Sequence, residues 1–243
     1  MAEFFQQIAE FFQRIGEFLQ PYLNPIYQNL IAKDRWQLIL SGLGNTLLIA
    51  LGAILISTVL GAIFSLWRIS DNKVLRGISY VYITVVRGIP VITQLMIIYF
   101  LILGSSGLDS TVIAIIGFGI NSGAYMTEIM RSGIQGVDPG QMEAGRSLGL
   151  SKWQTMFKII FPQAIKSIVP TYTNEFIVLI KETSVAGWIT VTDLTRAMDM
   201  IRNSTYNAWV PLITAAIIYL CLTMGLAKLF RLLERRLARS DRG

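Results

Sequence analysis

Chemically reactive side chains are scarce in this chain of 243 residues. It contains no histidine and a single cysteine, Cys221, so the commonest metal ligand and general base is missing and no internal disulfide can form. No segment matches the phosphate-binding pattern Gly-x-x-x-x-Gly-Lys-Ser/Thr, and the dipeptide Gly-Lys does not occur. We therefore predict no catalytic residue, no metal site and no cofactor bound by this chain.

Polar and ionisable residues inside apolar segments are the remaining candidates for chemistry, because a charge in such surroundings is costly. Asn174 and Glu175 stand near the middle of an apolar segment. Glu175 either pairs with a basic side chain or a hydroxyl such as that of Thr173, or lines a pathway with Asn174. In the second case these two residues bind the ammonium group or the side chain of a solute. Both interpretations stay open at this point.

Asn121 and Arg87 are two further candidates for such a pathway. Arg87 precedes Gly-Ile-Pro, so it is either the basic flank of the next helix or a gate or pathway contact. Glu128 and Arg131 are three residues apart, a spacing that favours a local ion pair on one helix.

A polar passage, residues 138–162, lies between strongly apolar segments and predicts two short helices joined by a tight turn. Asp138 can cap the first helix, which begins with proline, and Gln141 has the spacing to complete a capping box. Gly149 can adopt the left-handed conformation that ends this helix.

The second short helix begins at Ser151, and Gln154 repeats the capping-box spacing. Pro162 either ends this helix or begins the next segment. Two capped helices outside the bilayer offer a rigid surface, so we predict a docking element here.

The composition indicates an integral membrane protein. Hydrophobic residues make up 53% of the chain, charged residues make up only 15%, and the mean hydropathy is +0.55. A soluble domain would need roughly twice that charged fraction. The net charge of +6 comes from residues that flank apolar segments, which argues against nucleic-acid binding. We predict one all-α membrane domain in contact with a lipid bilayer.

About five apolar segments are predicted to cross the membrane as helices. The second is short and follows a helical approach over residues 78–86, and the fourth contains Pro170, where we predict a kink. The half-apolar stretch 182–207 is predicted to re-enter the membrane in part. The predicted spans are Leu43–Trp67, Pro90–Leu103, Thr111–Met130, Ala164–Ile180 and Trp209–Leu229.

A seven-residue repeat, EFFQQIA, EFFQRIG and EFLQ, occupies the N-terminus. Its apolar residues share one helical face, which favours an amphipathic helix in the membrane interface over a coiled coil of fewer than three heptads. It carries acidic residues first, which is atypical of a signal peptide. We divide the chain into residues 1–40, this helix and a linker, and residues 41–243, a transmembrane domain with a cytoplasmic loop at 134–162.

Basic residues are distributed unequally between the two sides that five spans define. Fifteen of the 21 lysines and arginines fall on one side and six on the other. The positive-inside rule then predicts an external N-terminus and a cytoplasmic C-terminus, with residues 138–162 in the cytoplasm.

The loop resembles the EAA motif of the type I permeases of bacterial ABC importers. That motif reads Glu-Ala-Ala, three residues, glycine, nine residues, isoleucine, one residue and Leu-Pro, and every spacing is kept here. Gly145 replaces the second alanine and Phe161 the leucine. The matching positions begin at Glu143 and end at Pro162.

This resemblance implies a coupling helix that sits in a groove of an ATP-hydrolysing partner subunit, which binds ATP and Mg. The implied coupling residues are Glu143, Ala144, Gly145, Gly149 and Pro162. We expect Ala144 and Gly145 to allow close approach of the partner's backbone. We expect Glu143 to offer a charged hydrogen bond, either at the interface or within the hairpin.

Further matches narrow the resemblance to the permeases of polar amino acid uptake, similar to those for histidine, glutamine and arginine. They cover roughly residues 42–236 and include GLGNTL from Gly42, RGIP from Arg87, NSGAYMTE from Asn121 and KETS from Lys181. Ile89 stands where the family usually has threonine. The phenylalanine-rich N-terminus has no counterpart.

The resemblance implies a multi-pass subunit of a bacterial inner, or cytoplasmic, membrane that moves a polar or charged amino acid into the cell. The implied partners are an ATP-binding cassette subunit, a second permease copy or homologue, and an extracytoplasmic amino-acid-binding protein. The alternative is a stand-alone ion-coupled transporter or channel, in which Glu175 and Lys181 carry the ion coupling. The absence of an evident inverted repeat argues against it.

Overall fold

The computed structural model describes residues 14, 20, 21 and 23–239, with side chains up to Glu234, and the secondary structure of this part is entirely helical. The predicted N-terminal amphipathic helix lies almost wholly outside the described residues. The α-helices are α2 (Arg35–Arg68), α3 (Lys73–Gly88), α4 (Val91–Met96), α5 (Ser110–Gln135), α6 (Pro139–Ser147), α7 (Lys152–Thr155), α8 (Phe161–Glu182), α9 (Leu194–Thr205) and α10 (Trp209–Arg239).

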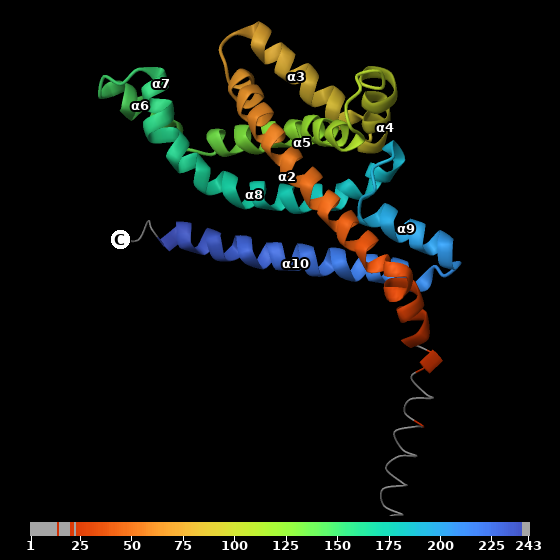
Figure 1. Cartoon of the computed structure of the whole chain (residues 1–243). Helices are drawn as coiled ribbons and strands as arrows, with labels where there is room; N and C mark the ends of the chain where they lie inside the picture. Colours follow the sequence, from red (N-terminus) through yellow and green to blue (C-terminus); the bar gives the residue numbers. More distant parts are fainter. Residues whose placement is uncertain (1–13, 15–19, 22, 240–243) are drawn as a thin grey trace, which may run out of the picture.

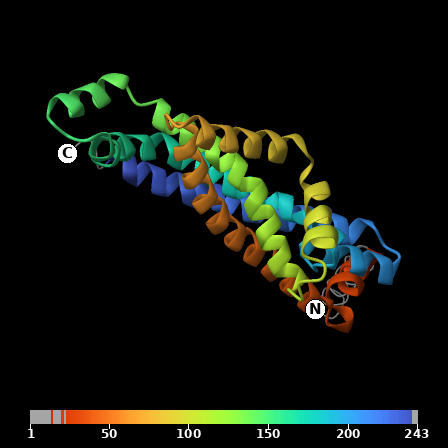
Figure 2. The same ribbon diagram turned by 90° about the horizontal axis from the view of Figure 1, so that it is seen from above.

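The longest helices, α2, α5, α8 and α10, form the body of the molecule; α3 runs along α2 and α5, and the other short elements lie at the two ends (Figures 1 and 2). Helix α8 lies between α5 and α10, and α2 crosses this layer diagonally (Figure 1). The hairpin of α6 and α7 lies at the same end as the last turns of α10, whereas α4 and α9 lie at the other end (Figures 1 and 2). The length of the bundle therefore separates the hairpin from α9.

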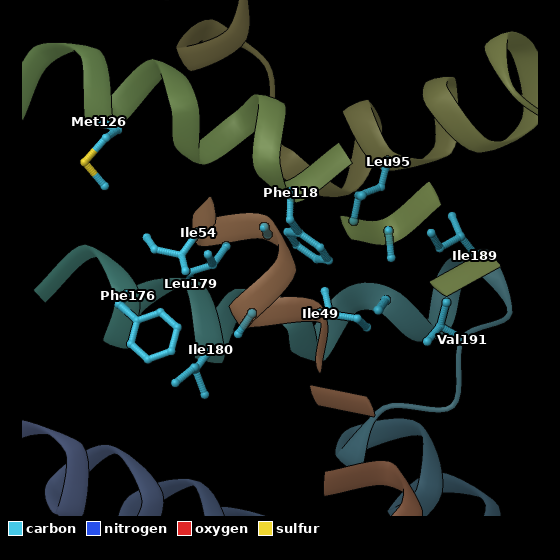
Figure 3. Close-up of a cluster of buried hydrophobic side chains, with 14 residues drawn as sticks. Ile49, Ile54, Leu95, Phe118, Met126, Phe176, Leu179, Ile180, Ile189 and Val191 are labelled. Atoms are coloured by element: carbon cyan, nitrogen blue, oxygen red, sulfur yellow. The ribbon is translucent and has the colours of Figure 1, made fainter. Parts of the chain in front are cut away.

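The hydrophobic core lies where α2, α5 and α8 meet (Figure 3). Ile49 on α2, Phe118 on α5 and Leu179 on α8 are each fully buried there. Helices α2 and α5 approach closely at Gly61, where a Cβ atom would lie 2.5 Å from the Met126 Cγ. Small residues let membrane helices pack at such short range.

Helix α2 begins at Arg35, before the predicted start of the first span at Leu43, so the last residues of the segment 1–40 are helical and not a linker. Residues 23–31 are also helical and continue into a span of Leu23–Arg68. The cause is packing: Ile39 is buried against Leu194 and Met198 of α9. Sequence pattern alone could not show that α9 covers this turn.

The predicted second span is not a straight helix. Helix α3 and the next segment, Val91–Ile102, meet at an angle of 106° across a break at Ile89 and Pro90. This segment consists of α4 and a π-helix, Ile97–Ile102. The break removes the helical hydrogen bonds of nearby backbone carbonyls. The Gln94 side-chain amide compensates for one of them by donating to the Ile89 carbonyl at 2.8 Å. The approach helix is therefore part of a bent element, as the shortness of the predicted second span suggested.

Three helices of the described chain are long and apolar enough to cross a membrane, or four if the bent pair counts as one span. They lie within Leu23–Arg68, Ser110–Gln135 and Trp209–Glu234. Helix α8 covers the predicted fourth span and continues through Pro170, but it is not among them. At 22 residues it is roughly 33 Å long, enough for a bilayer by length alone.

The stretch after α8 folds into a 3₁₀ helix, Thr183–Ile189, and then α9. Two hydrogen bonds join the start of α9 and the loop before it to α2: the Asn45 side-chain amide donates to the Thr192 carbonyl at 2.8 Å, and the Leu194 backbone amide donates to the Thr46 hydroxyl at 3.1 Å. This segment therefore packs against the far end of the bundle.

Candidate coupling hairpin and polar pathway

The first helix of the hairpin starts as the sequence predicts, with one exception. The Asp138 carboxylate accepts from the Gly140 amide at 2.7 Å, and Pro139 occupies the first turn. The predicted capping box is wrong, because the Gln141 amide oxygen accepts instead from the Gln163 side chain at 3.3 Å. That contact ties α6 to the start of α8.

The turn between the two helices depends on Gly149, which has the predicted left-handed conformation, with φ of +83°. The Leu150 amide donates to the Gly145 carbonyl at 3.1 Å, and the Gly149 amide donates to the Arg146 carbonyl at 3.0 Å. This pair of bonds is the Schellman motif, which satisfies the last carbonyls of a helix. The prediction for Gly149 is confirmed.

The second helix begins with the predicted capping box. The Ser151 amide donates to the Gln154 side chain at 2.8 Å, and the Gln154 amide donates to the Ser151 hydroxyl at 3.2 Å. Helix α7 then continues through a π-helix, Met156–Ile160, into α8, and Pro162 lies in the first turn of α8. The hairpin is thus continuous with a helix of the bundle.

Gly145 has a different place from the one expected. It is buried inside the hairpin, where a Cβ atom would lie 2.5 Å from Thr155 Cγ2 and 3.1 Å from Ile159 Cδ1. The expectation that Gly145 meets a partner's backbone is therefore wrong, because the second helix already occupies that side. The missing methyl group lets α6 and the second helix pack closely.

Glu143 and Ala144 lie on the exposed side of α6. Glu143 forms no hydrogen bond or ion pair with any residue that the structure describes. Its predicted role within the hairpin therefore finds no support here, and its carboxylate is accessible to a partner.

The hairpin is anchored to the bundle on two sides. Ile160 and Ala164 are buried with Ile134 of α5 in a small apolar cluster. On the other side, the Lys152 ammonium donates to Asp71, in the turn between α2 and α3. This hydrogen bond and the Lys152 charge hold the pKa of the exposed Asp71 carboxyl below its usual value.

A polar cluster interrupts the bundle where α5 faces α8. The Ser122 hydroxyl, fully buried, donates to a Glu175 carboxylate oxygen at 2.8 Å. Of the two interpretations of Glu175, the hydroxyl partner is thus present, but it is Ser122 and not Thr173. Thr173 donates instead to Glu234 at 2.9 Å.

Of the other pathway candidates, Asn121 lies beside this pair, whereas Asn174 does not. The Asn121 amide, 3% exposed, donates to the Gln94 side chain at 3.1 Å. The Arg87 guanidinium lies over the Tyr125 ring, 4.9 Å from its centroid. Asn174 is exposed, outside this cluster.

Sequence reasoning missed Ser122 and Gln94. Ser122 directly follows Asn121 and shares its helix, and Gln94 follows Pro90 by four residues, a position from which it can reach the broken backbone. The predicted ion pair between Glu128 and Arg131 is confirmed: Arg131 Nη2 donates to the Glu128 carboxylate at 2.7 Å.

The profile of the family described as the binding-protein-dependent transport system inner membrane component matches residues 53–239. The chain belongs to this family.

Two relatives that match most of this chain are also transport-system permease proteins. The chain is 38% identical over 201 residues to the putative glutamine transport system permease protein GlnP of Rickettsia bellii, covering 82% of this chain and 92% of that protein. It is 37% identical over 206 residues to the arginine transport system permease protein ArtQ of Bacillus subtilis, covering 84% and 94%.

Solved structures show the same fold. A chain of an amino acid ABC transporter crystallised with histidines is 41% identical, with a TM-score of 0.76, covering 82% of this chain and 94% of that one. A chain of the MetNI methionine ABC transporter, at 21% identity and a TM-score of 0.75, supports the fold alone.

As a member of this family, the chain is a multi-span inner-membrane permease component of an ABC transporter, not an enzyme, and it has the type I importer fold. A transport system that depends on a binding protein has several components. The family match therefore argues against the alternative of a transporter that works alone.

Proposed function

We propose that this chain is the membrane-spanning subunit of an ATP-driven importer that moves a polar or charged amino acid into the cell. The observation that carries the proposal is the 41% identity, over 82% of the chain, to the amino acid transporter chain. The named relatives for glutamine and arginine point to the same substrate class. ATP and Mg bind to a separate ATP-binding cassette subunit, and an extracytoplasmic binding protein delivers the solute.

The hairpin formed by α6 and α7 couples this subunit to the ATPase. Glu143 and Ala144 face outward from α6, while Gly145 and Gly149 give the hairpin its compact shape. Because the second helix runs on into α8, a displacement of the hairpin moves α8 with it. Helix α8 carries Glu175, so the hairpin is mechanically linked to the polar cluster.

Helix α8 also crosses the membrane, as the fourth crossing in chain order, and brings the total to five. Its charged residues make it too polar to face lipid, but they can face a solute pathway or another protein subunit. Asn174 and Arg87 are exposed on the isolated chain, in membrane segments where lipid contact would be costly. A second permease copy or homologue covering this side completes the wall of the pathway. Five crossings and the distribution of basic residues then place the N-terminus outside and the hairpin in the cytoplasm.

The polar cluster supplies complementary charges for a zwitterionic solute. Ser122 fixes one oxygen of the Glu175 carboxylate, which leaves the other to accept from an ammonium group. The Arg87 guanidinium, held over Tyr125, supplies the opposite charge. Asn121 and Gln94 hold each other and support the cluster from α5 and α4.

Reconstitution tests this function. The chain is purified with its ATPase and incorporated into proteoliposomes, and uptake of labelled arginine, glutamine and histidine is measured with the binding protein present. We expect uptake of at least one of them that requires both ATP and the binding protein. Liposomes without the binding protein serve as the control. ATP-independent uptake driven by an ion gradient would contradict the proposal.

A further inference from the structure

An apolar cleft of about 470 Å³ lies between the end of α2, the start of α3 and the second helix of the hairpin. Its volume falls within the range of small-molecule sites. Ile63, Leu66 and Trp67 of α2 line one wall, and Trp153 and Met156 line the other. The Trp153 side chain is 62% exposed. None of these residues belongs to the polar pathway or to the exposed side of α6.

The cleft opens at the membrane boundary. Trp67 and Arg68 end the apolar α2 span, and tryptophan and arginine are typical of that boundary. Beyond the turn, Val74 and Ile78 of α3 are 68% and 48% exposed. Exposed apolar side chains of α3 therefore lie on the same helix as Leu75, which lines the cleft.

An aromatic row extends from the cleft along the hairpin. The rings of Trp153 and Phe157 are 6.0 Å apart, and those of Phe157 and Phe161 are 6.2 Å apart. Phe157 is 54% exposed and Phe161 is 37% exposed. A contiguous exposed row of this kind marks a surface that something apolar covers.

Cations outnumber anions among the charged residues that line the cleft or stand within two positions of its lining residue Leu75 on α3. Asp71 and Lys152 both line it and form an ion pair. Arg76 lies close enough for its charge to act on Asp71, and Lys73 begins the same helix. Three cations and one carboxylate leave excess positive charge beside an apolar cleft, which fits a molecule with an anionic head and an apolar chain.

We propose that this cleft binds one anionic phospholipid, with an acyl chain between α2 and Trp153 and its phosphate against Arg76 and Lys152. A soluble protein surface fits less well, because the walls are the last turns of a membrane span. The lipid fills the space between α2 and the hairpin, so it supports the position from which the hairpin couples to its partner. The site is independent of which solute the chain transports.

Quenching of Trp153 fluorescence by brominated lipid tests the site. The chain, assembled with its ATPase subunits, is placed in phosphatidylcholine vesicles that contain phosphatidylglycerol. Bromine is carried by the acyl chains of one lipid or the other, at equal mole fraction. The signal of Trp153 is the difference between the wild type and Trp153→Phe. We expect brominated phosphatidylglycerol to quench Trp153 more strongly than brominated phosphatidylcholine.

Substitutions of the charged residues beside the cleft test whether positive charge causes the preference for phosphatidylglycerol. Arg76→Gln should reduce the preference for phosphatidylglycerol by about fivefold, the usual effect of one basic residue at a membrane surface. Asp71→Asn should raise it, because it removes the carboxylate that competes for Lys152, and misfolding cannot produce such a gain. Lys158→Gln, a charge change on the same hairpin but outside the cleft lining, should leave it unchanged.

Equal quenching by the two lipids, or an Asp71→Asn variant that loses the preference, would overturn the proposal. Quenching of Trp153 that is seen for the chain alone but is absent from the complex with its ATPase subunits would show that a partner protein covers the cleft, and would also overturn the proposal. The assay needs no transport. Normal uptake without a lipid preference therefore refutes this site alone, and a lipid preference without amino acid uptake refutes only the proposed function.

Discussion

Restoring the family's alanine at Gly145 should damage this chain, although alanine is the better helix former. Gly145→Ala favours α6 by up to about 1 kcal/mol through helix propensity. The new methyl group would lie 2.5 Å from Thr155 Cγ2, however, and overpacking of this kind costs about 1–3 kcal/mol. We expect a net local destabilisation of about 1 kcal/mol.

The second variant removes the closest of the clashing atoms, whereas Thr155 Oγ1, 2.9 Å from the added Cβ, stays and must shift slightly. Thr155→Ser deletes Cγ2 and keeps the hydroxyl that donates to the Ser151 carbonyl at 3.0 Å. Gly145→Ala should therefore be tolerated when combined with Thr155→Ser, with a coupling energy of at least about 1 kcal/mol in a double-mutant cycle.

Hydrogen exchange over residues 145–155, measured by mass spectrometry on the assembled complex, reports this local stability. We expect about fivefold faster exchange for Gly145→Ala and near-wild-type exchange for the double variant. Slower exchange in Gly145→Ala alone, with no coupling to Thr155→Ser, would refute the packing assigned to Gly145.

Three further outcomes follow from the same geometry. Glu143→Gln should change the stability of the hairpin, measured by hydrogen exchange, by less than about 0.5 kcal/mol, because Glu143 has no partner in the described structure. The same variant should lower the stimulation of ATPase activity by the binding protein. A parallel loss of hairpin stability and of ATPase stimulation would contradict a role at the interface. The pKa of Asp71 is lowered by Lys152, so its stabilising effect is present above the ordinary aspartate pKa and is lost as the pH falls through the lowered value. Hydrogen exchange at residues 152–156 should therefore differ between wild type and Asp71→Asn at neutral pH and converge in acid, whereas a constant difference would refute the ion pair. Ser122→Ala should weaken amino acid uptake about tenfold by removing a charged hydrogen bond, while Ser57→Ala, whose hydroxyl bonds only to the backbone of α2, should leave uptake unchanged.

The sequence predicts the hairpin well because local chemistry determines it. The Asp138 cap, the Ser151 capping box and the left-handed Gly149 all depend on residues within a few positions of one another. The Gln141 capping box failed because a residue from the next helix, Gln163, competed for the same side chain. Such a partner is separated by 22 positions and has no local signal.

Long-range packing limited the remaining predictions. The length of α2 depends on cover from α9, and the role of Gly145 depends on where Thr155 lies across the turn. The polar cluster was found only in part, because Ser122 is an ordinary residue type until Glu175 is known to face it. Charge in an apolar segment points to a functional residue, but its partner must come from the fold.

We propose that the hairpin transmits ATP hydrolysis in the partner subunit to the membrane helices. The most direct measurement compares binding-protein-stimulated ATPase activity in proteoliposomes for wild type and for a variant combining Glu143→Gln and Gly149→Ala. Lys228→Gln, on α10, serves as a control away from the hairpin. We predict that the combined variant loses most of the stimulation, and that Lys228→Gln retains it. Unchanged subunit assembly together with unchanged stimulation in the combined variant would contradict the claim.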